Sequence, residues 1–339
     1  MVLPWPESAD HHERIELIGT IKGNARTPGN RAQPMTPTLV RDDMQYWRMQ
    51  PDDRLRPWVI CYFLVEPTGQ TPPGERDPPG SQQQLLIPDG YSEIVFKLDA
   101  AFERWAIGQP DKRALMSASY LIGGRSHSVL TRNLGAVRLA GAKLDSRLLR
   151  AIMGIPLSEF RDSTLTLSEA GVRPLLDLDE SIQSAHAPEN IKADLDRFFL
   201  QALCRSTPEE PMVGALLQRI HLSRGTLSIM KWLRDKHIDS RTLERRFCAN
   251  MGMMPKQYAR VVRFKHSYRG LMVAEPSTAA RRTHLDPYYD QSHFIREFRK
   301  FLGTAPTARL AGRMLPVTTV SDHLLQGEFE LGGDPARRT

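Results

Sequence analysis

Two kinds of hydrophobic pattern divide the chain into a strand-rich part and a helical part. Runs rich in β-branched and aromatic residues, broken by Gly and Pro, predict strands within 57–66, 84–98, 120–131 and 136–144. Within 84–98 the Pro-Asp-Gly sequence predicts a tight turn between two strands. Apolar residues at helical spacing then predict a short helix at 146–154, which stops at Gly154, and further helices from about 172 to 204.

The two ends of the chain show little periodicity. We expect a mostly disordered lead-in at 1–43 and a flexible tail at 313–339, because both are rich in Pro, Gly and polar residues. A Pro- and Glu-containing stretch at 206–212 predicts a linker. The predicted fold is therefore α+β with two domains: a β-rich domain with flanking helices at 44–205, and an all-α domain at 213–312.

The all-α part contains an internal repeat. The segment DSRTLERRFCANMGMMP starts at Asp239, and DQSHFIREFRKFLGTAP starts at Asp290. An Asp, a large apolar residue, an Arg, a Phe, a Gly and a Pro recur at the same offset of 51 residues. One offset for all six positions indicates a repeated structural unit with no register slip.

Each copy of the repeat predicts a capped amphipathic helix. Asp239 and Asp290 are expected N-caps, because a carboxylate accepts from the free N–H groups of the first turn. Leu243 and Phe247 share the buried face of the first helix, and the second helix has the equivalent stripe of Phe294, Phe298 and Phe301. An apolar or small-residue stretch precedes each copy, at 227–238 and 277–285, and the order of helix, turn and capped helix predicts two helix-turn-helix motifs.

A long helix is expected between the two motifs, starting near Pro255. About 18 helical residues span roughly 27 Å. That length would place the two capped helices about one DNA turn apart, near 34 Å, along one face of a duplex.

The charge distribution supports a polyanion partner for the C-terminal part. Residues 213–312 contain 19 Lys or Arg and 7 Asp or Glu, a net charge of +12, whereas the rest of the chain has a net charge of −5. A basic domain beside a mildly acidic one is typical of a nucleic-acid-binding domain joined to a domain that binds something else.

The sequence gives little support for a metalloprotein, a secreted or membrane protein, or an enzyme. The three cysteines are widely spaced, so neither a zinc site nor a disulfide framework is encoded, and we expect no cofactor or metal. The N-terminal residues lack the pattern of a secretory signal, and no apolar run is long enough for a bilayer, so the expectation is a cytoplasmic protein with no membrane partner. Asp89 and Glu93 are better explained by turn chemistry than by catalysis, and we do not expect the protein to be an enzyme.

Four segments of the C-terminal domain carry a resemblance to a known family: SRTLERRF (240–247), G-x-x-P-K-x-Y (252–258), RFKHSYRGL (263–271) and YYDQSHFIREFRKFLGTAP (288–306). They resemble the AraC/XylS family of transcriptional regulators. The resemblance implies that two helices contact bases in successive major-groove segments through Arg241, Glu244, Arg245, Gln291, Ser292, Ile295 and Arg296. Phosphate contacts are expected from Lys256, Arg260, Arg263, Lys265, His293, Arg299 and Lys300.

The N-terminal part has a second resemblance. The segments YWRMQPDDRLRPWVICYF, LLIPDGYSEIVF and GAKLDSRLLRAIMGIPLSEF resemble the β-rich domain that precedes this DNA-binding domain in some family members. The resemblance implies a small-molecule effector, homodimerisation, or both.

The sequence departs from the family pattern at the motif turns. His237 and Pro287 replace glycines, and Leu233 and Thr283 replace a small Ala at the helix crossing. The helix expected before the second capped helix is also polar. Three interpretations therefore stay open for the second motif: it contacts bases, it docks loosely, or it contacts only phosphates.

Three functions are compatible with these observations. The first is a sequence-specific, double-stranded-DNA-binding transcription regulator. The second is a degenerate module of the same type that binds DNA without sequence preference. The third, with little support in the sequence, is a small-molecule enzyme at 44–205 fused to a DNA-binding domain.

Overall fold

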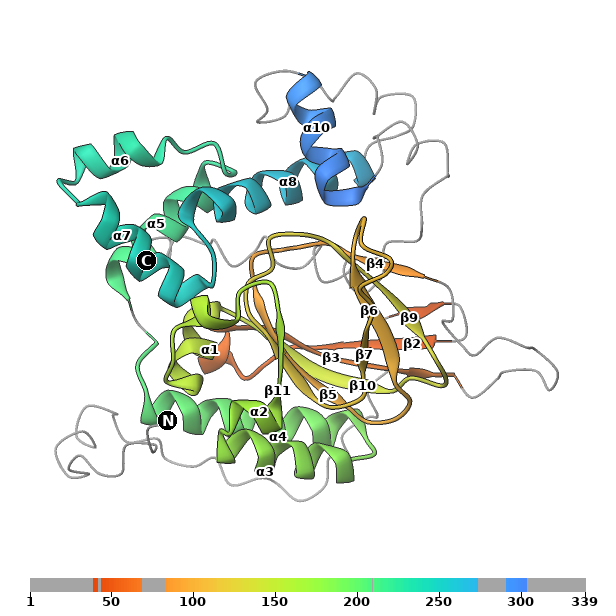
Figure 1. The fold of residues 1–339 in the computed structure, drawn as a ribbon. Helices are drawn as coiled ribbons and strands as arrows, with labels where there is room; N and C mark the ends of the chain where they lie inside the picture. The colour runs from red at the N-terminus through yellow and green to blue at the C-terminus, as the bar shows by residue number, and fades with distance from the viewer. Residues whose placement is uncertain (1–38, 42–43, 69–82, 209, 274–290, 304–339) are drawn as a thin grey trace, which may run out of the picture. The chain divides into compact units, whose positions relative to one another are not determined.

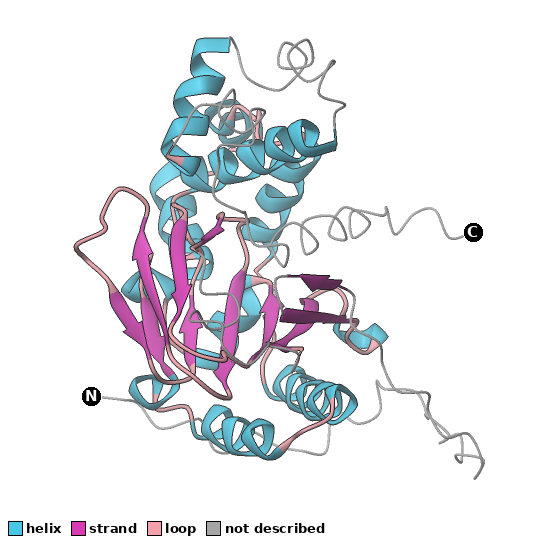
Figure 2. Cartoon of the chain, turned by 90° about the vertical axis from the view of Figure 1, so that its right-hand side faces the viewer, coloured by secondary structure: helices cyan, strands magenta, loops and turns pink. Residues whose placement is uncertain are grey.

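A computed structural model describes residues 39–41, 44–68, 83–208, 210–273 and 291–303. The strands form two antiparallel sheets (Figures 1 and 2). The seven-stranded sheet has the order β1-β2-β3-β10-β5-β8-β11, with β1 Leu39–Arg41, β2 Met44–Met49, β3 Val59–Pro67, β10 Leu139–Leu144, β5 Ser92–Lys97, β8 Tyr120–Ile122 and β11 Thr164–Thr166. The four-stranded sheet has the order β4-β9-β6-β7, with β4 Gln84–Leu86, β9 Val129–Asn133, β6 Phe102–Ala106 and β7 Ala114–Met116.

The chain passes from one sheet to the other at two places in this region. β4 and β5 lie on either side of the Pro-Asp-Gly turn, as predicted, but β4 pairs with β9 and β5 pairs with β8 and β10, so the two strands belong to different sheets. The stretch 120–131 likewise splits into β8 and β9, one in each sheet. The cause is that period-2 alternation reports which face of a strand is buried and not which strand pairs with it.

Ordered structure also begins earlier than the sequence suggested. β1 pairs with β2 through Leu39–Tyr46, Val40–Gln45 and Arg41–Met44, within the predicted lead-in. Most of that lead-in, and the predicted tail at 313–339, lie outside the described residues.

Helices flank the seven-stranded sheet. They are η1 Asp53–Leu55, α1 Ser146–Met153, η2 Leu157–Phe160, α2 Leu167–Ala170, α3 Arg173–Ser184 and α4 Pro188–Arg205. α1 ends at Gly154, which adopts φ +69°, as the sequence predicted. α3 packs on β5, and α4 packs on β3 and η1.

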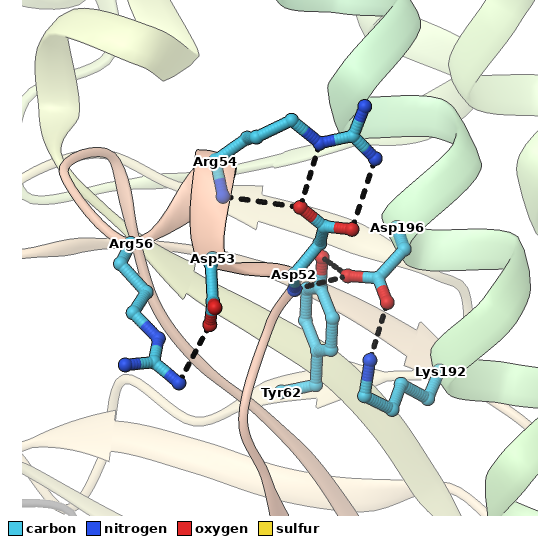
Figure 3. A network of polar contacts seen from close by, with 7 residues as sticks. All are labelled: Asp52, Asp53, Arg54, Arg56, Tyr62, Lys192 and Asp196. Carbon is cyan, nitrogen blue, oxygen red and sulfur yellow. Dashed lines mark hydrogen bonds and ion pairs between the residues drawn. The ribbon is translucent and has the colours of Figure 1, made fainter. Parts of the chain in front are cut away.

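A polar network fixes α4 to the sheet (Figure 3). The Tyr62 hydroxyl and the Asp52 backbone N–H both donate to Asp196 Oδ1, each over 2.9 Å, and Lys192 pairs with Asp196 Oδ2. The Tyr62 ring also stacks on Phe199 of α4, with 6.0 Å between ring centroids. Burial and the carboxylate of Asp196 raise the pKa of Tyr62, so the hydroxyl remains a donor.

The C-terminal part is helical. It contains α5 Pro211–Leu222, α6 Ile229–Asp235, α7 Ser240–Met251, α8 Pro255–Val273 and α10 Gln291–Leu302. The apolar faces of α5, α6, α7 and the start of α8 form one buried cluster, which includes Leu216, Leu233 and Phe247. We call residues 39–205 the β domain and residues 211–302 the helical domain.

Candidate nucleic-acid interface

The first predicted reading helix is α7, and its two faces match the sequence pattern. Asp239 caps it, since its Oδ2 accepts from the backbone N–H of Thr242 over 2.7 Å. Leu243 and Phe247 are fully buried. The opposite face exposes the three predicted base-contacting side chains, Arg241, Glu244 and Arg245. A capped helix end with exposed Arg and Glu can donate to and accept from base edges in a major groove.

The turn before α7 tolerates histidine in place of glycine. His237 adopts φ +52°, a left-handed conformation in which His is less disfavoured than most non-glycine residues. The N–H of Ile238 donates to the Leu233 carbonyl, and the N–H of His237 donates to the Arg234 carbonyl. These two bonds form a Schellman motif that ends α6. The departure at position 237 therefore leaves the geometry of the first turn intact.

The second predicted reading helix, α10, has the same length as α7 and corresponding bounds. Both helices have 12 residues, and each bound of α10 is 51 higher than that of α7. Both are followed by a left-handed glycine, Gly252 at φ +68° and Gly303 at φ +70°. In this conformation a residue with a side chain would be strained.

The faces of α10 also match the sequence pattern. Its stripe of Phe294, Phe298 and Phe301 is buried. Ser292 and Arg296 are exposed, and Ile295 is half-buried. The side chain of Gln291 and the residues Thr283, Pro287 and Asp290 lie outside the described part of the chain, so the second cap and the second turn stay predictions.

The predicted phosphate-contacting residues fall into three groups. Lys256, Arg299 and Lys300 are exposed, whereas Arg263 and His293 are half-buried. Arg260 of α8 is engaged in a bidentate ion pair with Glu297 of α10, in which both N–O distances are 2.9 Å. Lys265 is only 4% exposed, and its Nζ lies 4.8 Å from the centre of the Tyr91 ring in the β domain. In this arrangement Arg260 joins α8 to α10, and Lys265 packs α8 against the β domain.

The first motif packs closely on the β domain at two glycines, Gly90 and Gly124. A Cβ at Gly124 would lie 2.6 Å from the Met251 carbonyl oxygen, at the end of α7. A Cβ at Gly90 would lie 2.9 Å from the Tyr258 ring of α8. α7 also contacts α1 and η2, with Asn250 Oδ1 3.5 Å from Arg150 Nη1. Only glycine permits this approach of the two backbones.

Replacing Gly124 with Ala should weaken this contact. Because the nearest atom is a backbone oxygen, the added methyl group forces the two segments apart, and we expect a loss of about 1–3 kcal/mol in unfolding free energy. Chemical denaturation of the full-length protein measures it. Gly123→Ala is the matched control, since its Cβ would meet the Phe160 ring at an ordinary 3.4 Å. Equal losses in the two variants would contradict the close approach.

A histidine beside this contact makes the stability of the protein depend on pH. His221 Nε2 lies 3.0 Å from the Tyr258 hydroxyl. Burial, with a further contribution from the charge of Lys265, lowers the pKa of His221 to about 4. In the unfolded chain His221 is protonated below about pH 6.5, whereas in the folded chain it stays neutral until about pH 4. The free energy of unfolding therefore falls as the pH drops from about 6.5 towards 4.

The expected loss between pH 7 and pH 5 is about 1–2 kcal/mol from this residue. We expect His221→Gln to remove that part of the pH dependence. Denaturation curves of both proteins at the two pH values measure the difference, and the carboxylates titrate equally in both. If the variant loses as much stability as the wild type on acidification, His221 is not the group responsible.

The second motif is held by the β domain as well. Phe264 and Tyr268 of α8 and Phe294, Phe298 and Phe301 of α10 form one buried cluster with Leu85, Ile87, Trp105 and Leu130 of the four-stranded sheet and its edge. Phe264 and Phe301 stack with 4.3 Å between ring centroids. The apolar stripe of α10 is therefore covered jointly by α8 and by the sheet.

The other face of the same sheet borders a cavity. Between the two sheets lies a cavity of about 100 Å³, lined from the seven-stranded side by residues such as Phe63, Val95 and Leu139, and from the four-stranded side by Leu86, Phe102 and Thr131. Polar groups also line it, among them Glu93, Tyr120, Arg125 and Lys143. A largely apolar cavity with a few polar groups is the usual form of a small-molecule site.

The residues considered for other chemistry are accounted for by structure. Asp89 Oδ1 accepts from the Tyr91 N–H, as turn chemistry predicted, and its Oδ2 pairs with Lys143. Burial alone would raise the pKa of Asp89, but the charges of Lys143, Lys265 and Arg125 outweigh it and hold the pKa below its ordinary value. Among the described residues no three His, Cys, Asp or Glu side chains are grouped to bind a metal. Nor does any described helix have the length and apolarity to cross a membrane.

Comparisons with known proteins find two matching regions in the chain. Residues 232–311 match the family described as a helix-turn-helix domain, and residues 47–166 match a domain of unknown function (DUF6597). No curated protein sequence matches the chain. Among solved structures, ToxT from Vibrio cholerae O395 is 11% identical and covers 80% of this chain and 98% of its own, with a TM-score of 0.37. An apo variant of ToxT from Vibrio cholerae strain SCE256 is 10% identical and covers 80% and 97%, with a TM-score of 0.38.

Proposed function

We propose that the protein recognises a specific double-stranded DNA sequence with two helices. The premise is that the C-terminal part of this chain is an AraC-type helix-turn-helix domain of a DNA-binding transcription regulator. α7 and α10 would each enter a major groove, in two successive segments. One observation carries the proposal. The same 12-residue helix occurs twice, each time with a buried apolar stripe and with an exposed arginine at the equivalent position, Arg245 and Arg296.

The proposed contacts divide into two kinds. Arg241, Glu244, Arg245, Ser292 and Arg296 are exposed on the two helices and are assigned to base edges, together with Gln291 and Ile295 by their place on α10. Arginine suits guanine, and glutamine suits adenine. Lys256, Arg299 and Lys300 are assigned to phosphates, with Arg263 and His293 as half-buried candidates. Phosphate contacts fix register and make binding sensitive to salt.

The β domain is proposed to receive a small-molecule effector in the cavity between its two sheets. One face of the four-stranded sheet lines this cavity, and its other face packs against α8 and α10. Occupancy of the cavity can therefore bias the position of the second reading helix. Homodimerisation and a cytoplasmic location complete the proposal. No catalytic role is assigned to any residue.

Selection of bound sequences from a random duplex library tests the proposal, using the full-length protein at near-physiological salt. We expect an enriched motif with two contact blocks about one helical turn apart. A single block would mean that only α7 reads bases and would overturn the role of α10. Binding without any enrichment would overturn sequence recognition altogether and would favour a module with non-specific DNA affinity.

A further inference from the structure

An ion pair joins α10 to α8 directly beside the arginine that is assigned to base contact on α10. The Nε and Nη2 groups of Arg260 on α8 donate to Oε2 and Oε1 of Glu297 on α10, each over 2.9 Å. Glu297 is 9% exposed, and the side chain of Arg260 is 25% exposed. A bidentate arginine–carboxylate pair is stronger and more restricted in geometry than a single hydrogen bond, and a partly buried one is screened less by salt.

The aromatic stripe of α10 leaves the rotation of this helix about its own axis weakly specified. Phe294, Phe298 and Phe301 pack on α8 and on the four-stranded sheet. Hydrophobic burial is non-directional, so a stripe of similar rings stays covered when the helix turns slightly. Glu297 lies at the edge of this stripe, one position before Phe298. Its bidentate pair with Arg260 is directional and therefore selects one rotation.

α8 gives the pair a fixed reference. Val261, next to Arg260, packs in the cluster that contains α10 and the four-stranded sheet, whereas Val262 packs in the cluster of α5, α6 and α7. The segment of α8 that carries Arg260 is therefore held from both sides. Side chains one position apart on a helix point about 100° apart, so a fixed Glu297 also fixes the direction of Arg296.

The first motif has an ion pair at the equivalent position, with the charges exchanged. Arg246 of α7 lies 51 positions before Glu297, and it follows Arg245 as Glu297 follows Arg296. Its Nη1 lies 3.2 Å from Oε1 of Glu210, the residue directly before α5. In each motif the residue after the reading arginine thus joins its helix to an earlier segment. The pair of the second motif is the more buried and is bidentate.

We propose that Arg260 and Glu297 are positioning residues, which orient α10 so that Arg296 faces the major groove. The proposal rests on the proposed recognition of DNA by two helices and names the contact that aims the second one. In this role Arg260 acts through Glu297. A phosphate contact from Arg260 is the alternative, and it predicts different results for the variants below.

Glu297→Gln tests the proposal, because charge and positioning predict changes of opposite sign. Loss of a negative charge from a DNA-binding surface should by itself strengthen binding to any duplex. We expect the affinity for the selected duplex to fall about tenfold or more, because the base contacts of the α10 block are lost, while the affinity for a random duplex stays equal or rises. Titration of both duplexes with the full-length protein measures this. Affinity for the selected duplex at or above that of the wild type would overturn the positioning role.

Hydrogen exchange of the α10 amides separates positioning from a merely structural role. We expect these amides to stay protected in Glu297→Gln, because the aromatic stripe still packs on α8 and on the sheet. Protection that collapses together with the α10 contact block would mean that the ion pair only holds the helix in place, and the proposal would fail.

The double variant Arg260→Glu, Glu297→Arg separates positioning from a phosphate contact. It rebuilds the pair in the charge order of the first motif, where Arg246 on the reading helix meets Glu210. We expect it to recover most of the affinity for the selected duplex that Glu297→Gln loses. A phosphate contact from Arg260 would be absent in this variant. Binding as weak as that of Glu297→Gln would therefore overturn the proposal.

Asp235→Asn is the matched control. Asp235 is exposed at the end of α6, so its replacement removes the same charge from the helical domain and should leave both contact blocks in place. The wild type distinguishes a failure of this proposal from a failure of the proposed function. Two contact blocks in both the wild type and Glu297→Gln would overturn only the positioning role, whereas a wild type without the α10 block would overturn both.

Discussion

Replacing Trp105 with Ala should detach the second reading helix without unfolding the first. Trp105 is 4% exposed and packs in the cluster that joins the four-stranded sheet to α8 and α10. Removing a buried Trp of this kind costs about 3–5 kcal/mol. Because Trp105 lies outside the cluster that holds α7, the loss should fall mainly on α10. On a selected DNA site we expect the contact block assigned to α10 to weaken strongly, while the α7 block persists.

The control for this variant is Leu115→Ala. Leu115 lies on the neighbouring strand β7 and is 61% exposed, so its truncation should change neither stability nor DNA contacts by a measurable amount. Hydrogen exchange of the α10 amides and footprinting on DNA measure the effect. Unchanged exchange in α10 of the Trp105 variant would contradict the role of the sheet in holding this helix.

Replacing both Arg245 and Arg296 with Ala should remove most of the specific binding. Each arginine is exposed on its helix, and within the described residues neither has an ion-pair partner. A good bidentate contact to a base pair contributes about 1–3 kcal/mol of discrimination, so the double variant should lose several kcal/mol of specific binding. Affinity for random-sequence DNA should fall much less, since the exposed lysines remain.

A matched pair of arginines separates this effect from the loss of charge. Arg219 of α5 and Arg173 of α3 are exposed and lie outside both reading helices, so their replacement with Ala removes the same charge. Titration of each protein against the selected duplex and a scrambled duplex gives the specificity ratio. If the ratio survives in the double variant at 245 and 296, the assignment of these residues to the grooves is wrong.

Local sequence features predicted the bounds and buried faces of α7 and α10. The buried face of α7 was predicted from the four-residue spacing of Leu243 and Phe247, and its N-cap from the preceding Asp239. The structure confirms both. The offset of 51 residues carried the same features to Phe294 and Phe298 of α10. These features are local, because capping and helical periodicity depend only on residues within a few positions.

The parts that the sequence left unresolved depend on contacts between distant segments. Lys265 belongs to a basic and apolar pattern typical of a phosphate-contacting helix, yet it packs over Tyr91 of the β domain. A helix face has the same spacing whether water or another domain covers it. The same reason applies to Gly124, whose role appears only when the Met251 backbone lies against it.

The central claim is that α7 and α10 read two separate segments of one DNA site. Interference footprinting on the selected duplex with single variants tests it most directly. We predict that Arg245→Ala abolishes the base contacts of one block and Arg296→Ala those of the other, with about one helical turn between the blocks. If both substitutions affect the same block, or if Arg296→Ala changes no base contact, the two-helix account is contradicted.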